Sequence, residues 1–363
     1  MSDQQGIGVK AKKGVGWVFV ERLLIRGVVF IRIPALAYLL APDDFGLMAL
    51  ITPILVFLDV ITRTGFSAAL IQKKDDVSGY WDVVWSMNLV KGVIQTGLIL
   101  LLIQPITAFY DEPILSSMLL VIAGATFIKN TTSIRMAALV RAINIRKIAL
   151  YNVTTDALGT VVTISLAYYY RNVWGLVYGK LITIMIKTAG SYIIAPYKPR
   201  FDFNRDKMTD LWSFSKWILV SGIFLTLFRN GDDLFVGKVL GVTAVGYYAM
   251  AYKMGNMVTT ELVTSIRKVL YPTFSLLQDD IPRLRISFLI SYSMTAALGF
   301  LFSLGLFLLA PQFVSILLPD KWLPIIPPLR VLAVWGGLQM LSTSVAPLVK
   351  ATGRPDRWAK LQM

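Results

Sequence analysis

The chain has 363 residues, of which 56% are hydrophobic and 16% are charged, and its mean hydropathy is +0.64. This composition excludes a soluble globular protein of the same length and indicates an integral membrane protein. The net charge of +15 is divided between short loops and apolar segments rather than gathered on one soluble face, which argues against a nucleic-acid-binding protein.

Apolar stretches occupy most of the chain. A membrane-spanning helix needs about 20 apolar residues, and the sequence contains ten stretches of about this length. The first is too long for the core of a signal peptide, so we interpret it as a retained span. The sequence thus predicts an all-α integral membrane protein with about ten spans, at residues 15–40, 46–70, 83–104, 114–138, 148–169, 174–195, 213–238, 245–272, 286–310 and 325–349.

The basic residues outside these stretches predict an orientation. If the N-terminus is cytoplasmic, the inside segments hold 18 lysines and arginines, whereas the outside loops hold only Arg171, Lys238 and Lys321. Cytoplasmic loops of membrane proteins carry an excess of basic residues. We therefore expect both ends of this chain on the cytoplasmic side.

The sequence also repeats itself. Trp17, Leu40, Gly46 and Ala49 recur at a shift of 200, and Ser133 with the segment Leu139–Ala142 recurs at a shift of 209. An even number of spans per repeat makes the two copies parallel. We expect a six-helix bundle at 1–197, a cytoplasmic loop at 198–212 and a bundle of four helices at 213–363, packed around a central cationic cleft. Met363 corresponds to about residue 154 of the first copy, so the second copy lacks counterparts of the fifth and sixth helices. We therefore expect this chain to be a fragment of a longer transporter.

Fifteen of the 36 lysines and arginines fall inside the predicted spans. A cation at the centre of a membrane helix costs at least about 2.5–3.5 kcal/mol, so such a side chain usually faces a watery cavity or a charged partner. The spans hold far fewer acids than cations, which predicts an anionic ligand. The residues predicted to bind it are Arg22, Arg26, Arg63, Lys91, Lys129, Arg229, Lys253 and Arg267.

The acids inside the spans leave two interpretations open. Asp59, Asp232, Asp233 and Glu261 either form structural ion pairs or bind a coupling proton or sodium ion. Asp59 and Arg63 have the i, i+4 spacing of an intrahelical pair. The chain has no histidine and no cysteine, so we expect no metal site, no cofactor and no catalytic centre. A membrane glycosyltransferase or polymerase remains the remote alternative.

Several motifs carry a family resemblance: Gly16-Trp17, Leu40–Leu47, Asp59, Gly65–Gln72, Asn230–Asp233, Gly237–Gly241, Gly246–Ala251, Tyr271–Ser275, Lys321-Trp322 and Gly353–Pro355. In order and spacing they resemble the polysaccharide-unit (Wzx-type) flippases of the multidrug/oligosaccharidyl-lipid/polysaccharide exporter superfamily, in the lipopolysaccharide and exopolysaccharide branch. The resemblance implies a protein of the bacterial inner membrane that moves undecaprenyl-diphosphate-linked oligosaccharides outward for O-antigen, capsule or exopolysaccharide. Its expected partners are this substrate, membrane lipids and other polysaccharide assembly proteins.

Two alternatives remain within the same superfamily. One is a flippase for lipid II, and the other is a multidrug exporter. Organic cations would favour an acidic cleft, so the cationic excess disfavours the multidrug exporter.

Overall fold

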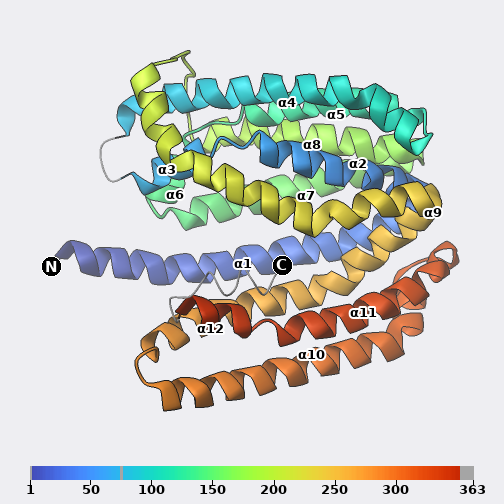
Figure 1. Cartoon of the computed structure of the whole chain (residues 1–363). Coiled ribbons are helices and arrows are strands. Elements are labelled where there is room, and N and C mark those ends of the chain that lie inside the picture. Colours follow the sequence, from blue (N-terminus) through green and yellow to red (C-terminus); the bar gives the residue numbers. More distant parts are fainter. Residues whose placement is uncertain (1, 74–76, 352–363) are drawn as a thin grey trace. The chain divides into compact units, whose positions relative to one another are not determined.

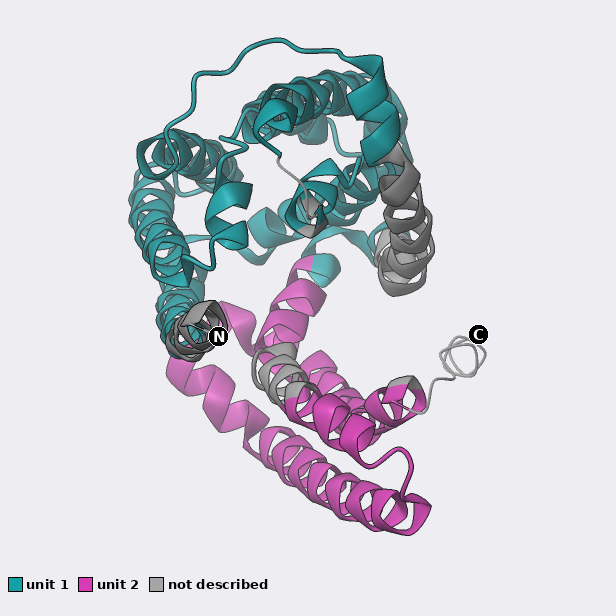
Figure 2. Cartoon of the chain, turned by 90° about the vertical axis from the view of Figure 1, so that its left-hand side faces the viewer, with its two compact units in different colours: residues 1–245 teal, residues 246–363 magenta. Residues whose placement is uncertain are grey.

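The computed structural model describes residues 2–73 and 77–351, and it describes their side chains except those at 2–13, 15, 68, 72, 212–236, 256–262, 264, 265, 268 and 350. The described chain is almost entirely helical and contains no strand. Its helices form two compact units, residues 1–245 and 246–363, which Figure 2 distinguishes by colour. We describe each unit by itself.

The first unit is built from pairs of helices joined by short turns (Figure 1). α4 packs on α5, α7 packs on α8, α1 lies along α7, and α5 lies on α8. Side chains of α2, α4, α5 and α8 form its main apolar core, where Ile51, Leu115 and Met118 are fully buried. The helices are α1 (Ser2–Leu39), α2 (Pro42–Ile61), α3 (Phe66–Gln72), α4 (Trp81–Tyr110), α5 (Ile114–Asn130), α6 (Met136–Arg141), α7 (Ile145–Tyr170), α8 (Val173–Ile194) and the first part of α9 (Arg205–Leu276), with the 3-10 turn η1 (Ser78–Tyr80) before α4.

Small residues let α7 and α8 approach closely. A Cβ atom added to Gly175 would lie 2.6 Å from the Cα of Ala167, and one added to Gly159 would lie 2.5 Å from the side chain of Thr183. Small residues at a helix interface allow the dense packing that holds membrane helices together. α1 packs against α7 of this pair, and α5 packs against α8.

Two of the predicted spans are broken helices. The span 46–70 divides into α2 and α3, and the chain turns between them at Gly65, whose φ is +68°. The span 114–138 divides into α5 and α6 across residues 131–135. Each break ends a helix within a predicted span, and the unpaired carbonyl groups at such an end favour a cation nearby.

The second unit contains the rest of α9, α10 (Ile281–Leu317), the 3-10 turn η2 (Asp320–Ile325), α11 (Ile326–Leu341) and α12 (Val345–Ala351). α10 and α11 pack closely, because a Cβ added to Gly299 or Gly337 would overlap the facing side chain. In the part of α9 that belongs to the first unit, the helix changes direction at Gly241, whose φ of +80° and ψ of 169° are not helical. This residue lies between the predicted spans 213–238 and 245–272.

The all-helical, membrane-type fold predicted from the sequence is confirmed. Within the described residues, four helical stretches are long and apolar enough to cross a membrane: Pro42–Ile61, Ser78–Tyr110, Ile281–Leu317 and Asp320–Val349. The other predicted spans also fall on helices, but several of these helices are strongly charged, such as α1 with Arg22, Arg26 and Arg32. The count of ten spans, their layout as six plus four around a cleft, and the boundaries 1–197, 198–212 and 213–363 stay predictions.

Candidate functional site

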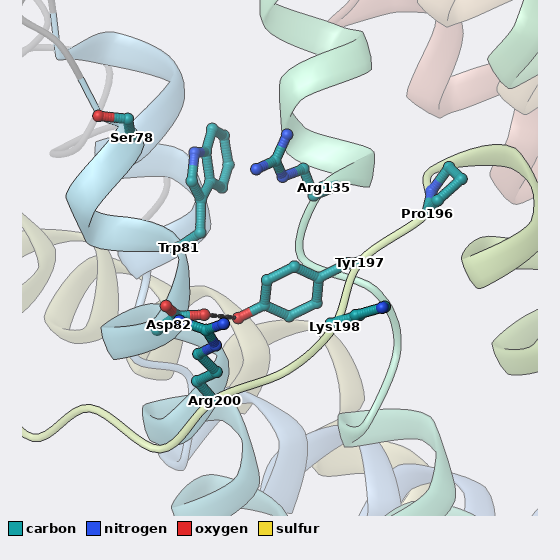
Figure 3. A pocket seen from close by; sticks show the side chains of 8 residues that line it. All are labelled: Ser78, Trp81, Asp82, Arg135, Pro196, Tyr197, Lys198 and Arg200. Carbon is teal, nitrogen blue, oxygen red and sulfur yellow. Dashed lines mark hydrogen bonds between the residues drawn. The ribbon is translucent and has the colours of Figure 1, made fainter.

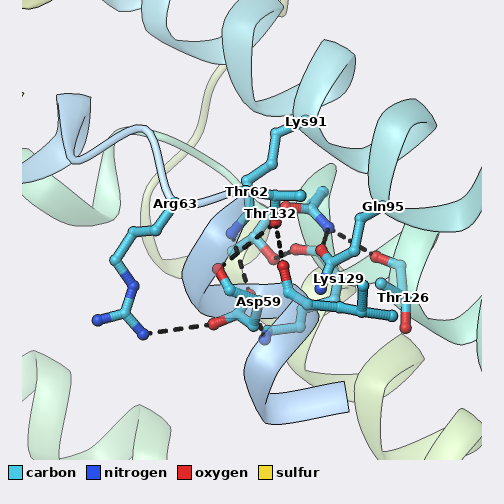
Figure 4. Close-up of polar contacts among 10 residues, drawn as sticks. Asp59, Thr62, Arg63, Lys91, Gln95, Thr126, Lys129 and Thr132 are labelled. Carbon is cyan, nitrogen blue, oxygen red and sulfur yellow. Dashed lines mark hydrogen bonds and ion pairs between the residues drawn. The ribbon is translucent and has the colours of Figure 1, made fainter. Parts of the chain in front are cut away.

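Asp59 is the centre of a charged cluster inside the first unit (Figure 4). It lies on the last turn of α2, just before the break at residues 62–65. Lys91 Nζ lies 3.0 Å from its Oδ1 atom, Lys129 Nζ lies 3.4 Å from the same oxygen, and Arg63 Nη2 lies 3.4 Å from Oδ2. One carboxylate therefore contacts three cations.

Local structure explains why these side chains meet. Arg63 follows Asp59 by four residues, which places the two side chains on one face of the chain. Lys91 lies ten residues into α4, about 15 Å from the start of that helix at ~1.5 Å per residue. Lys129 belongs to the last turn of α5, where the helix dipole favours a positive charge.

The four side chains differ in exposure. Lys91 is 13% exposed and Asp59 is 24% exposed, whereas Arg63 is 49% and Lys129 is 56% exposed. Three positive charges and one negative charge leave the cluster with a net charge of +2. Lys180 of α8 adds to this excess, since it lies close enough to Lys129 for electrostatic repulsion. The surplus charge is therefore presented by the two most exposed cations.

A network of uncharged polar side chains supports the cluster. Asn130 Nδ2 donates to Gln95 Oε1 at 3.1 Å and to the carbonyl of Thr126 at 2.9 Å. Gly92 lies against Asn130, because an added Cβ would come within 2.8 Å of the Asn130 Cβ. These contacts fix the end of α5 on α4 and so hold Lys129 beside Lys91. Sequence reasoning missed Gln95 and Asn130, although Gln95 follows Lys91 by four residues and Asn130 follows Lys129 directly.

The structure brings together Asp59, Arg63, Lys91 and Lys129 among the predicted residues. Arg22 and Arg26 lie half-buried on α1, which packs along α7. In the second unit, Lys253 is exposed and Arg267 is half-buried, both on α9. The side chains of Arg229, Asp232, Asp233 and Glu261 are outside the described ones, so their roles stay predictions.

No donor set for a metal ion is found in the part of the chain whose side chains are described. A metal site needs several histidine, cysteine or carboxylate ligands at one point, and no group of three or more such residues occurs there. The net positive charge of the Asp59 cluster makes it a candidate site for an anion, with Asp59 as a counter-charge. Lysine and arginine supply charge-assisted hydrogen bonds, and Asp59 limits their mutual repulsion.

Comparison with known proteins identifies relatives along most of the chain. The family of polysaccharide biosynthesis proteins matches residues 35–327. The succinoglycan biosynthesis transport protein ExoT of Rhizobium meliloti (strain 1021) is 24% identical over 343 residues, which cover 94% of this chain and 69% of ExoT. The lipopolysaccharide biosynthesis protein WzxC of Escherichia coli (strain K12) is 24% identical over 349 residues, covering 96% of this chain and 71% of WzxC.

A solved structure shares the fold. The inward-facing conformation of a multidrug resistance MATE family transporter of the MOP superfamily matches with a TM-score of 0.67. The match covers 94% of this chain and 86% of the transporter, at 13% sequence identity. At that identity the likeness concerns the path of the chain through space rather than the ligand.

Proposed function

The chain belongs to the family of polysaccharide biosynthesis proteins, and we propose that it is a flippase for lipid-linked oligosaccharide repeat units in the bacterial inner membrane. The names of ExoT, a transport protein for succinoglycan biosynthesis, and of WzxC support this function. The resemblance to Wzx-type flippases predicted from the sequence is confirmed by these matches. The lipid-linked unit would serve the assembly of a surface polysaccharide.

The charged cluster around Asp59 is the observation that carries the proposal. A lipid diphosphate has two negative charges, and its passage through a medium of low dielectric constant is costly unless fixed cations accompany it. The net charge of +2 on Asp59, Arg63, Lys91 and Lys129 matches that requirement. The oligosaccharide would travel with the diphosphate, while the lipid tail stays among the surrounding lipids.

Exposure indicates how the cluster would exchange partners. Lys91 is the least exposed cation and is closest to Asp59, so we assign it to holding the carboxylate. Arg63 and Lys129 are more exposed and lie farther from Asp59, at 3.4 Å each. They would transfer to the arriving diphosphate. The planar fork of Arg63 suits two phosphate oxygens, and Lys129 acts as a point charge that tolerates movement.

Translocation of this kind breaks no covalent bond in the substrate, so we propose that the chain is not an enzyme. The excess of basic residues on one side supports an orientation with both ends of the chain in the cytoplasm. Coupling to a proton or sodium ion stays a proposal. Asp59 is the candidate whose surroundings are described, and Asp232, Asp233 and Glu261 are the others.

The proposal is tested in a strain from which the gene is deleted. We expect the deletion to remove a surface polysaccharide and the wild-type gene to restore it. Arg63→Ala/Lys129→Ala should restore about one tenth or less, a loss of about 1.4 kcal/mol of substrate stabilisation or more. Arg205→Ala, which removes an exposed cation at the start of α9, is the matched control and should restore it fully.

Other results would reassign the protein. Normal surface polysaccharide in the deletion strain, or in cells with Arg63→Ala/Lys129→Ala, would contradict the proposal. Rescue of cells depleted of their lipid II flippase would favour lipid II as the substrate. Increased sensitivity to organic cations after deletion would favour the multidrug exporter.

A further inference from the structure

An open pocket of about 310 Å³ lies at one end of the first unit, away from the Asp59 cluster. Its position is set by the start of α4, since Asp82 precedes Lys91 by nine residues, or about 14 Å along the helix at ~1.5 Å per residue. Figure 3 shows the residues that line it: Ser78, Trp81, Asp82, Arg135, Pro196, Tyr197, Lys198 and Arg200.

Three cations surround this pocket. Arg135 comes from the break between α5 and α6, whereas Lys198 and Arg200 come from the segment that joins α8 to α9. The Arg135 guanidinium lies over the ring of Trp81, 5.8 Å from its centroid, and this contact holds the cation in place. Within the described residues, no carboxylate lies within 4.0 Å of a charged nitrogen of these three side chains. Their charge is available to a ligand.

The single described carboxylate in the pocket is already engaged. The Tyr197 hydroxyl donates a hydrogen bond to Asp82 Oδ1. Burial and the contact with Asp82 raise the pKa of Tyr197, so the phenol remains a protonated donor at physiological pH. Three cations and one carboxylate leave the pocket with a net charge of +2.

The segment that carries Lys198 and Arg200 is fastened on both sides of these residues. Before them, Ser133 Oγ donates to the carbonyl of Ala195 at 2.7 Å. After them, the Asp202 amide donates to Ser86 Oγ at 3.0 Å, and the Phe201 ring meets Trp85 edge-on with centroids 5.7 Å apart. A site whose groups are held before binding loses less entropy when the ligand arrives. The backbone that carries Lys198 and Arg200 is therefore held in place, although both residues lie outside the helices and have exposed side chains.

We propose that this pocket binds the diphosphate group of the lipid-linked substrate at the cytoplasmic surface, before the substrate reaches the Asp59 cluster. The proposal rests on the proposed function and adds a second anion site to it. The shared chemistry is that of a phosphate ester, which bulk anionic lipids also carry. The net charge distinguishes the two sources, because a diphosphate diester carries two negative charges and a phosphodiester headgroup carries one.

Direct binding measurements test the pocket independently of transport. The protein is purified as the full chain with Arg63→Ala/Lys129→Ala, which disables the Asp59 cluster, in phosphatidylcholine nanodiscs. Farnesyl diphosphate is the probe, titrated at low salt. We expect binding to persist in this background and to weaken about tenfold or more when Arg135→Ala/Arg200→Ala is added. Arg205→Ala, a cation at the same end of the unit that does not line the pocket, should change the affinity less than about twofold.

A second variant distinguishes loss of binding from loss of folding. Arg135→Lys/Arg200→Lys keeps both charges, and its affinity should fall between those of the arginine and alanine forms. Three outcomes would overturn the proposal. These are unchanged binding in Arg135→Ala/Arg200→Ala, an equal loss in Arg205→Ala, and full competition by phosphatidylglycerol added to the nanodiscs. None of these measurements depends on surface polysaccharide, so the proposed function and the pocket can fail separately.

Discussion

Asp59 is placed where one carboxylate stabilises three cations at once. Without it, Arg63, Lys91 and Lys129 would repel one another, and Lys91 would keep its charge with little access to water. Lys91, at 13% exposed, is the cation with least access to solvent. We therefore expect the charge on Asp59 to stabilise the fold as well as to keep the cations in place for an anion.

The first prediction separates these two roles. Asp59→Asn should lower the free energy of unfolding by about 1–3 kcal/mol, less than for a fully buried pair because the cluster is partly exposed. Adding Lys91→Met removes the stranded charge and should recover most of the loss. Thermal unfolding of the purified variants measures both effects, with Asp206→Asn as an exposed control. No recovery in the double variant would show that Asp59 acts through another contact.

A second residue-scale prediction concerns the link between α3 and α9. Lys73 Nζ donates to Asp210 Oδ2 at 2.6 Å, and the Tyr80 hydroxyl donates to the same oxygen at 2.9 Å. The hydrogen bond from Lys73 and then that from Tyr80 lower the pKa of Asp210. A carboxyl group with a lowered pKa stabilises the fold above its unfolded pKa of about 3.9 and loses that contribution as pH falls through the folded value.

Wild type should thus lose stability below about pH 4 more steeply than Asp210→Asn does. Between pH 5 and pH 8 the two unfolding curves should run parallel. Unfolding temperatures from pH 3 to pH 8 check this, with Asp206→Asn expected to follow wild type. Superimposable acid profiles for wild type and Asp210→Asn would refute the link.

At the scale of elements, the helix breaks decide what the site contains. The break at residues 131–135 lets Lys129 end one helix while Arg135 begins the next, so one span serves both the Asp59 cluster and the pocket. A similar break at 342–344 separates α11 from α12, at the shift that aligns Ser133 with Ser342. The break at Gly65 has no such counterpart, because α9 continues as a helix past Ser265.

The sequence predicts the helices better than their breaks. Apolar runs such as 46–70 and 114–138 indicate single spans, because hydropathy averages over the short polar segments at 62–65 and 131–135. The cluster was partly predictable, since Asp59, Arg63, Lys91 and Lys129 all fall in spans. That they share one site depends on the packing of α2, α4 and α5, which residue spacing along one helix does not encode. The sequence did not predict the pocket, because Arg135 and Arg200 come to line it through the contacts of Ser133 with Ala195 and of Ser86 with Asp202, which join segments far apart in the chain.

A third prediction tests the packing of α7 on α8. Gly175→Val places a side chain against the backbone of Ala167, whose Cα and N atoms would lie 2.6 and 2.9 Å from the new Cβ. Backbone cannot move aside as a flexible side chain can, so we expect a loss of about 1–3 kcal/mol in the free energy of unfolding. Gly97→Val is the matched control, since a Cβ there meets nothing within 4 Å. Equal unfolding temperatures for the two variants would show that α8 can shift without cost.

At the scale of the whole molecule, charge is distributed unequally between the two ends of the first unit. α3, α6 and α8 end, and α4, α7 and α9 begin, at one end of the unit, which Figure 1 shows on the left. Among the described basic residues outside the helices, Lys73, Lys198 and Arg200 lie at this end, whereas the turns at the other end carry only Arg171. The pocket lies at the basic end. If that end faces the cytoplasm, the pocket faces the side from which the substrate is proposed to arrive.

The last prediction fixes this orientation. Because the chain has no cysteine, single cysteines report which side of the membrane they occupy without background labelling. Asp206→Cys marks the basic end of the first unit, Pro113→Cys marks the turn between α4 and α5, and Asp279→Cys marks the turn between α9 and α10; all three positions are exposed. In spheroplasts, a membrane-impermeant maleimide should label Pro113→Cys at once and the other two only after permeabilisation. The opposite pattern would place the pocket outside the cell, where a substrate made in the cytoplasm could not reach it before crossing, and the order of binding from pocket to Asp59 cluster would then have to be reversed.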